Sequence, residues 1–398
     1  MRRGTRQWAT GLALAAGIAA LGVAQAALEA ASQGQTVEAP RFEVDPLWPK
    51  PLPNHWVLGS AIGVGVDSKD HVFIIHRGLP TLNPRTEAGA AASPPTGECC
   101  LAAPPILEFD PEGNLVNSWG GPGAGYEWPS SNHGISIDHK DDVWIGGNGS
   151  DSVRVDSQVL KFTHDGRFLL QIGQPNQRPN SNSLEHFGRV AKIAFDVSAN
   201  EAYLADGYGN KRVAVIDMDS GKIKRYWGAY GNKPEDLNLG PYDPDAPLAQ
   251  QFRNPVHCAE PTTDGLVYVC DRPNDRIQVF RKDGSFVKEV RIAPRTLGDG
   301  SVWDIAFSRD PAQKYLYLAD GKNEKIYVIE RQSLEILTAF GDGGRQPGQF
   351  FAVHSIATDS KGNIYTTETY EGKRVQKFAY RGLGRVSRNQ GVVWPRGR

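Results

Sequence analysis

Short segments in which apolar and polar residues alternate recur along most of the chain. The clearest copies cover residues 63–67, 134–138, 192–196, 304–308 and 355–359, and each ends in Asp or Ser before a turn. A weaker copy covers residues 258–262. Alternation with a period of two is typical of half-buried β-strands. The pattern therefore predicts six copies of one β-sheet unit.

Each unit continues with a second and a third strand, and usually a fourth. An acidic residue that ends the second strand is followed five or six positions later by an arginine, a spacing that resembles the NHL repeat; the pairs are Asp206 with Arg212, Asp271 with Arg276, and Glu368 with Arg374. These pairs are interpreted as ties within one hairpin rather than as catalytic groups. Six such sheets can bury both faces only when packed into a ring. The sequence predicts an all-β, six-bladed β-propeller of NHL type.

Ring closure and one insertion are the irregular parts of this pattern. The sixth unit lacks a fourth strand after Tyr380, and residues 41–48 and residues 391–394 are competing candidates for it. A propeller usually closes by combining strands from both ends of the chain. Residues 79–105, rich in Pro, Ala and Gly, are expected to form a long loop on one face.

The N-terminal segment has the pattern of a targeting signal. Three arginines precede an uncharged, Ala- and Leu-rich run, and Ala24-Gln25-Ala26 is a small-x-small cleavage site. We expect residues 1–26 to be a signal peptide, residues 27–40 a flexible tether and residues 41–398 the propeller, with the protein exported to the periplasm or secreted. An uncleaved anchor is the alternative; after signal removal no stable membrane insertion is expected.

Composition adds two constraints. The formal net charge of −1 gives no electrostatic reason to expect a nucleic acid partner. Export permits disulfides, and Cys258 and Cys270 flank a turn in a way that would place them opposite each other on a hairpin. The alternative is two reduced thiols, and the pairing of Cys99 and Cys100 is left open.

Three of the nine histidines share one repeat position. His133, His257 and His354 each stand just before the first strand of the second, fourth and sixth units, where the other units have Ile62, Ala191 and Trp303. First strands of a propeller line its central channel, so three imidazoles should converge there. Three His ligands with an open fourth position are typical of catalytic zinc. The remaining histidines (His55, His71, His76, His139, His164 and His186) are expected to be solvated.

Local segments around these histidines resemble the peptidyl-α-hydroxyglycine α-amidating lyase, the second catalytic unit of the peptide-amidating enzyme. The similar segments are residues 64–69 with 76–78, 133–138, 206–208, 255–257, 271–278 and 353–354. The resemblance covers roughly residues 44–380 and implies that His133, His257 and His354 bind zinc.

The resemblance also implies roles for three other residues. Tyr208 matches the proposed base, Arg77 an active-site arginine, and Arg272 a further one. Arg77 would either bind the substrate carboxylate or hold Tyr208 as a phenolate. The family has a structural calcium held by carbonyls matching Val64 and Ile135 and by a carboxylate, but Ser355 stands in place of that carboxylate here.

The activity implied is zinc-dependent cleavage of the C–N bond of an N-acyl- or peptidyl-α-hydroxyglycine into an amide and glyoxylate. The family's oxidative unit is absent from this sequence, so a separate monooxygenase would supply the small-molecule or peptide substrate. Two alternatives remain open: a non-catalytic NHL propeller that binds a protein or carbohydrate, and a metal-dependent propeller hydrolase. Hydrolases of that kind usually hold calcium through Asp, Glu and Asn, which an all-His site argues against.

Overall fold

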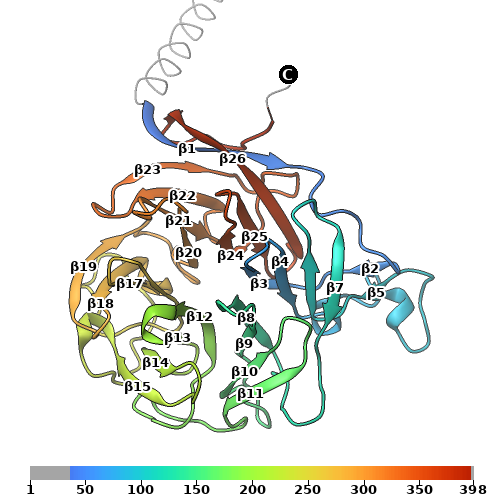
Figure 1. The fold of residues 1–398 in the computed structure, drawn as a ribbon, viewed down its shortest axis with the longest axis horizontal. Helices are drawn as coiled ribbons and strands as arrows, with labels where there is room; N and C mark the ends of the chain where they lie inside the picture. Colours follow the sequence, from blue (N-terminus) through green and yellow to red (C-terminus); the bar gives the residue numbers. More distant parts are fainter. Residues whose placement is uncertain (1–35, 396–398) are drawn as a thin grey trace, which may run out of the picture.

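The computed structural model describes residues 36–395, and these form six four-stranded antiparallel sheets arranged in a ring (Figure 1). The expected signal peptide lies outside the described residues. The described helices are all short 3-10 turns, and no described helix is long and apolar enough to cross a membrane. The six-bladed propeller predicted from the repeats is confirmed.

Each blade runs outward from the channel through four strands. The inner strands are β3 (Ala61–Val66), β8 (Asn132–Ile137), β12 (Val190–Asp196), β16 (Val256–Pro261), β20 (Asp304–Phe307) and β24 (Val353–Thr358). The second strands are β4 (Val72–His76), β9 (Val143–Gly147), β13 (Glu201–Asp206), β17 (Leu266–Asp271), β21 (Tyr315–Asp320) and β25 (Ile364–Glu368). The inner strands contact their neighbours in turn around the ring, and β24 returns to β3.

The third strands are mostly buried, and the outermost strand is the more exposed one in most blades. The third strands are β6 (Ile106–Phe109), β10 (Gln158–Phe162), β14 (Arg212–Asp217), β18 (Arg276–Arg281), β22 (Lys325–Glu330) and β26 (Arg374–Ser387). The outer strands are β7 (Leu115–Trp119), β11 (Phe168–Gly173), β15 (Ile223–Trp227), β19 (Phe286–Arg291), β23 (Ile336–Phe340) and β1 (Thr36–Asp45). Second strands are buried on both faces, whereas outer strands alternate with solvent, as packed blades require.

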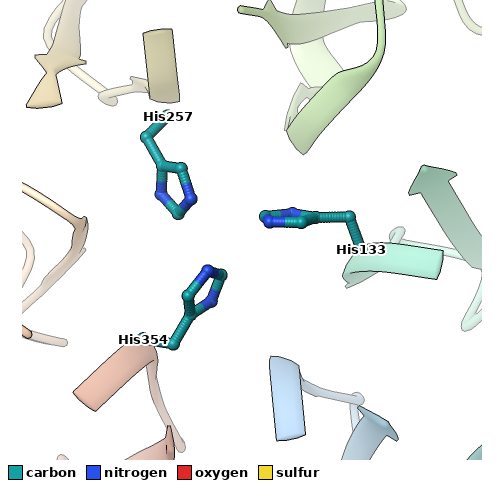
Figure 2. A group of neighbouring side chains, drawn as sticks. All are labelled: His133, His257 and His354. Carbon is teal, nitrogen blue, oxygen red and sulfur yellow. The ribbon is translucent and has the colours of Figure 1, made fainter. Parts of the chain in front are cut away.

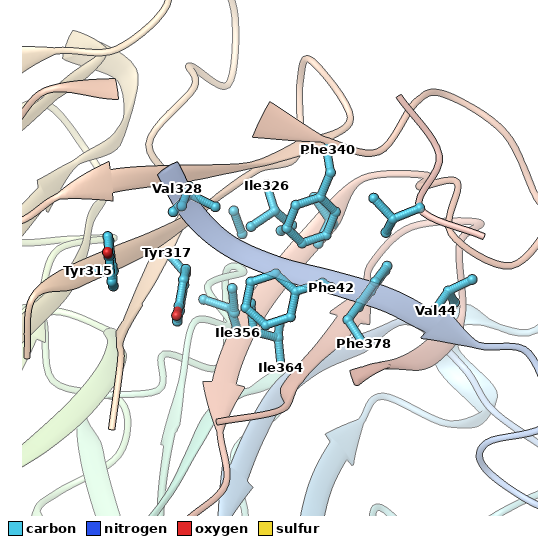
Figure 3. Close-up of a cluster of buried hydrophobic side chains, with 14 of the residues drawn as sticks. Phe42, Val44, Tyr315, Tyr317, Ile326, Val328, Phe340, Ile356, Ile364 and Phe378 are labelled. Carbon is cyan, nitrogen blue, oxygen red and sulfur yellow. The ribbon is translucent and has the colours of Figure 1, made fainter. Parts of the chain in front are cut away.

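The ring is closed by the N-terminal side of the described chain. Strand β1 pairs antiparallel with β26 and becomes the outer strand of the sixth blade. Phe42 on β1 packs among Tyr317, Phe340 and Tyr380 of blades five and six (Figure 3). Of the two candidates for the fourth strand of the sixth blade, the segment beginning at residue 41 is therefore the one that completes it. Its strand starts earlier than expected, so residues 36–40, assigned above to the tether, belong to the propeller.

The C-terminal competitor has a smaller role. Val393 accepts a backbone hydrogen bond from Val44, and Gly391 accepts one from Gly341. This segment therefore fastens β1 and β23 from outside without joining the blade. It is held by a few single hydrogen bonds rather than by a ladder.

Both cysteine pairs are disulfide-bonded. Cys258 and Cys270 lie opposite each other on β16 and β17, which confirms the pairing expected from the turn between them. Cys99 and Cys100 form a bridge between adjacent residues within the insertion. Within that insertion, β5 (Leu101–Ala102) pairs in parallel with β2 (Trp56–Val57), and both lie at the outer edge of the ring in Figure 1.

Candidate metal centre

The three histidines converge at one end of the channel (Figure 2). Each is the second residue of its inner strand, and each lies at a register irregularity between that strand and the next. A β-bulge redirects a side chain away from the regular pleat. His133, His257 and His354 are therefore turned toward the axis, with ring centroids 4.8–5.2 Å apart.

One ring nitrogen of each histidine is fixed by the neighbouring blade. Nδ1 of His133 lies 2.7 Å from the carbonyl oxygen of Ala191, and Nδ1 of His354 lies 2.8 Å from that of Ile62. Nδ1 of His257 makes the same contact with Trp303 at 2.5 Å. A carbonyl only accepts, so Nδ1 carries the proton and Nε2 keeps its lone pair. Ile62, Ala191 and Trp303 stand at the histidine position in blades one, three and five. Their carbonyls thus orient the histidines of the neighbouring blades six, two and four.

The electrostatics keep these rings neutral. Burial, reinforced by the charge of Arg77, lowers the pKa of His133 to about 3. Burial also lowers the pKa of His257 and His354 well below the ordinary value. Neutral imidazoles whose outer nitrogen is bound to a carbonyl are the usual form of metal-ligating histidine. One ligand atom from each histidine lies within 4.8 Å of the others, so this group can hold a metal ion.

Tyr208 reaches the same point from the loop that follows β13. Its hydroxyl oxygen lies 2.9 Å from Nε2 of His133 and 3.1 Å from Nε2 of His257. Gly207 permits this approach, because a Cβ atom at that position would lie 2.0 Å from the carbonyl oxygen of Val256. The hydroxyl therefore lies next to the position that a metal held by these nitrogens would occupy.

Two arginines flank Tyr208, and they occupy the same repeat position. Arg77 is the first residue after β4, and Arg272 the first after β17. Nη1 of Arg272 lies 3.5 Å from the Tyr208 hydroxyl, and its guanidinium stacks 4.5 Å from the ring of Trp303. Nε of Arg272 is buried and has no hydrogen-bond partner among residues 36–395. It is an unsatisfied donor.

The guanidinium of Arg77 already has hydrogen-bond partners within the protein. Its Nη2 donates to Oδ1 of Asn148 at 2.8 Å, and its Nε donates to the carbonyl oxygen of Asn132 at 3.3 Å. An open pocket of about 570 Å³ begins beside Arg77 and has Leu79 and Trp128 among its walls.

The sequence predicted the residues at the metal position, but it did not predict the residues that contact the two arginines. Asn148 holds Arg77, Trp303 stacks on Arg272, and Asp299 lies 3.4 Å from Nη2 of Arg272. Asn148 stands at the repeat position of the two arginines, and an alignment of the blades could have identified it. Asp299 lies in an irregular loop, where no repeat position exists to mark it.

Calcium held by the backbone carbonyls of Val64 and Ile135 stays a prediction. The Ser355 hydroxyl donates to Asp304 at 2.6 Å. The ammonium group of Lys192 lies 2.7 Å from Asp304 and already supplies a cation to this part of the channel.

The expectation that the other histidines are solvated is wrong for His76, whereas His71 and His164 are partly exposed. His76 is fully buried on β4, and its Nδ1 accepts hydrogen bonds from the backbone of Gly59 and Gly78. His71 and His164 meet two buried carboxylates at the edge between blades one and two. Turn positions were taken as exposed, but in a propeller the turns of one blade pack against the next.

Comparisons with known proteins give relatives at low identity. The chain is 26% identical to peptidylglycine alpha-amidating monooxygenase of Rattus norvegicus over 322 residues, which are 78% of this chain and 30% of that protein. It is 27% identical to peptidyl-glycine alpha-amidating monooxygenase B of Xenopus laevis over 331 residues, 81% of this chain and 34% of that protein. The chain thus spans about a third of the length of these relatives.

A second group of relatives matches in length. NHL repeat-containing protein 3 of Mus musculus is 23% identical over 358 residues, 86% of this chain and 85% of that protein. No protein-family model matches the chain. Among solved structures, a catalytically inactive virginiamycin B lyase from Staphylococcus aureus with Quinupristin has a TM-score of 0.46 at 16% identity, covering 87% of this chain and 88% of that one. The chain is therefore similar both to amidating monooxygenases and to NHL-repeat proteins.

Proposed function

We propose that this protein is a zinc-dependent lyase that cleaves the C–N bond of an N-acyl- or peptidyl-α-hydroxyglycine, releasing an amide and glyoxylate. The observation that carries the proposal is the Tyr208 hydroxyl, placed between Nε2 of His133 and Nε2 of His257. A metal position and a potential base thus adjoin each other. Similarity to proteins named as amidating monooxygenases supports the same reaction class.

The donor set suits zinc. Neutral imidazole is a preferred ligand of Zn²⁺, and three of them leave a fourth position for substrate. When bound, zinc acts as a Lewis acid that makes an oxygen ligand more acidic.

Tyr208 is assigned as the base. Nη1 of Arg272 lies 3.5 Å from its hydroxyl oxygen, so a guanidinium adjoins the proposed base. Tyr208 takes the proton of the substrate's α-hydroxyl. The carbon–oxygen bond then becomes a carbonyl as the carbon–nitrogen bond breaks with its electron pair, and the amide nitrogen gains a proton. The products are the amide and glyoxylate, with no oxidant or water consumed.

Arg272 is assigned to the substrate carboxylate. Its buried Nε lacks a partner, and a carboxylate would satisfy it with a charge-assisted hydrogen bond. The guanidinium of Arg77 already donates to Asn148 and Asn132. It therefore contributes positive charge rather than a group free to bind a carboxylate. The pocket beside Arg77, with its apolar walls, would take the acyl or peptidyl part of the substrate.

The substrate has to be made by hydroxylation of a glycine α-carbon. We infer that a monooxygenase activity supplies the substrate, and that both act after export. Recovery of a mature N-terminus near Ala27 would support export, whereas an intact Met1 on cytoplasmic protein would refute it.

The test is turnover of α-hydroxyhippurate by the purified protein, followed by release of glyoxylate and benzamide. We expect both products in equal amounts, loss of activity with a chelator, and recovery with Zn²⁺. His133→Ala should abolish turnover, whereas His139→Ala, at an exposed turn, should not. Zinc-loaded protein that cleaves no α-hydroxyglycine would refute the lyase assignment and leave the binding-propeller or hydrolase alternative.

A further inference from the structure

A second group of potential metal ligands lies at the other end of the inner strands. Asp67 follows β3, His71 is in the next turn, Glu108 is on β6, and His164 is in the hairpin between β10 and β11. One ligand atom from each lies within 4.8 Å of all the others. Three of the four belong to blade one and His164 belongs to blade two, so the group spans the boundary between the blades.

The contacts within this group direct all four side chains to one place. Nε2 of His164 lies 3.0 Å from Oδ2 of Asp67 and 3.4 Å from Oε1 of Glu108. Nδ1 of His71 lies 2.6 Å from the same Glu108 oxygen. Oδ1 of Asp67 accepts backbone hydrogen bonds from Lys69 and His71, which leaves Oδ2 facing the group.

Charge compensation here depends on the two imidazoles. The side chains of Asp67 and Glu108 are 0% and 3% exposed. Within residues 36–395 neither carboxylate is paired with a lysine or an arginine. Two buried carboxylates without a cation are costly. The side chains of His71 and His164 are 25% and 33% exposed, so solvent and ions can reach the group.

The equivalent position in blade two contains its own cation. Strand pairing matches Glu108, opposite Phe73, with Lys161, opposite Trp144. In blade two the ammonium group of Lys161 lies 3.0 Å from Asp138 and 2.9 Å from Asp142. Blade one has a carboxylate where that lysine stands, and His71 where Asp142 stands.

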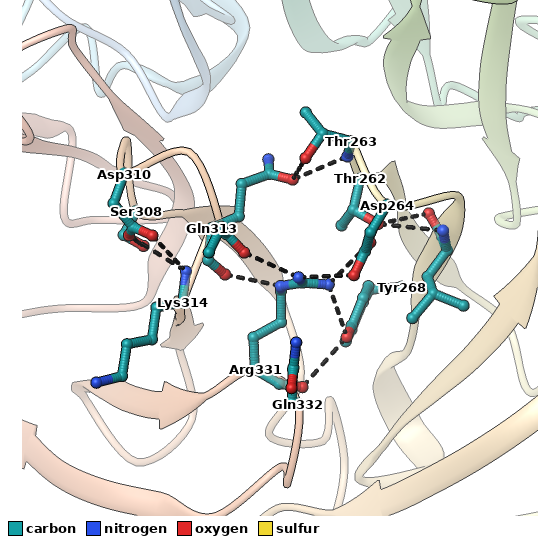
Figure 4. Close-up of polar contacts among 12 residues, drawn as sticks. Thr262, Thr263, Asp264, Tyr268, Ser308, Asp310, Gln313, Lys314, Arg331 and Gln332 are labelled. Carbon is teal, nitrogen blue, oxygen red and sulfur yellow. Dashed lines mark hydrogen bonds and ion pairs between the residues drawn. The ribbon is translucent and has the colours of Figure 1, made fainter.

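In blades four and five the equivalent of His164 is a cation. In the same hairpin position blade four has Lys282, which pairs with Asp196 of blade three. Blade five has Arg331, which pairs with Asp264 of blade four at 2.8 Å (Figure 4). At the boundary between blades one and two, Glu108 therefore stands at the position of Lys161. His164 stands at the position of Lys282 and Arg331.

We propose that Asp67, His71, Glu108 and His164 bind a structural divalent metal, Zn²⁺ by its ligand preference, that joins blade one to blade two. Two imidazoles and two carboxylates complete a closed four-ligand set. Tetrahedral bonds of about 2.0–2.2 Å separate ligand atoms by about 3.3–3.6 Å, near the 3.0 and 3.4 Å observed around His164 and longer than the 2.6 Å between His71 and Glu108. The metal takes the place that Lys282 has between blades three and four and that Arg331 has between blades four and five.

The test is the metal content of the purified full-length protein, measured by elemental analysis after equilibration with Zn²⁺ and desalting. Wild type should hold two equivalents, one for each group. His164→Lys installs the residue that blade four has at this position, so it should keep the blade boundary while reducing the content to one equivalent. His133→Ala should also hold one, and the double variant none. His139→Lys, at an exposed histidine outside both groups, should keep two.

A second variant and a second readout complete the test. Glu108→Gln should likewise hold one equivalent if His164→Lys fails to fold. Zn²⁺ should raise the unfolding temperature of the His133→Ala variant but not that of the double variant. Undiminished metal in His164→Lys and Glu108→Gln would overturn the proposal. So would a metal-free His133→Ala variant, which would leave His71 and His164 as direct partners of the two carboxylates.

Discussion

At the scale of single residues, the site depends on which nitrogen of each imidazole carries a proton. Backbone carbonyls of Ile62, Ala191 and Trp303 hold the Nδ1 protons, so every Nε2 lone pair faces the channel axis. Because the carbonyls come from the adjacent blade, the packing of blades orients the ligands. The pKa of His133, near 3, keeps its ring neutral throughout the physiological range.

Tyr208→Phe isolates the proposed base. The change removes one oxygen and little packing, so folding and metal content should be unchanged. Turnover should fall by about 10²–10⁴-fold, as for other lost general bases, with a smaller effect on KM. Steady-state kinetics on α-hydroxyhippurate measure this. Wild-type kcat in a metal-loaded Tyr208→Phe variant would show that Tyr208 is not the base.

Arg272→Lys tests the substrate carboxylate. Lysine keeps the positive charge but loses the Nε donor and the planar fork, so KM for a free carboxylate should rise by roughly 10-fold or more. The methyl ester of the same substrate serves as the matched control, because it lacks the charge that Arg272 would bind. An equal rise in KM for the acid and the ester would mean that Arg272 acts on Tyr208 rather than binding the substrate carboxylate.

At the scale of elements, strand β1 is the closing element of the ring. It supplies Phe42, Val44 and Ala39 to a cluster whose other members come mostly from blades five and six, with Val393 from the C-terminal segment. Its bulge between Pro40 and Phe42 sets the register against β26. Closure therefore depends on apolar burial as well as on the backbone ladder.

Phe42→Ala should destabilise the propeller by about 3–5 kcal/mol, because it leaves a cavity between Tyr317 and Phe340. Urea unfolding followed by tryptophan fluorescence gives the free energy. Leu47→Ala, in the same segment but 72% exposed, should change it by less than about 0.5 kcal/mol. Equal losses in both variants would argue against closure through the Phe42 cluster.

At the scale of the whole molecule, buried charges link blades around the channel below the histidines. Lys192 of blade three pairs with Glu260 of blade four at 2.9 Å and with Asp304 of blade five at 2.7 Å. Asp304 also accepts from Ser355 of blade six. Burial alone would lower the pKa of Lys192, but the two carboxylates reverse this and raise it.

Lys192→Met should cost about 3–5 kcal/mol of unfolding free energy, because it leaves Glu260 and Asp304 buried without their cation. Lys224→Met removes a more exposed partner of Glu201 and should cost only about 0–1 kcal/mol. Chemical denaturation at neutral pH measures both. A Lys192→Met variant as stable as Lys224→Met would mean that these ion pairs do not hold the ring.

The sequence alone determined the number of blades, the strands within them, and the shared position of His133, His257 and His354. It also indicated that Cys258 and Cys270 lie opposite each other on a hairpin, although the disulfide itself was left open. All of these follow from local alternation and from a repeat, because an ideal blade places equivalent residues at equivalent points. No distance between remote segments had to be known.

Tertiary structure alone decided which end closes the ring, which carbonyls hold the histidines, and which charges meet across blade boundaries. His164 and Asp67 are 97 positions apart, and Lys192 and Asp304 are 112 apart. Neither pairing leaves a periodic trace, because periodicity reports only which face of its own sheet a residue occupies. Whether a turn residue meets solvent or a neighbouring blade depends on how the sheets pack, and that is decided only when the ring is closed.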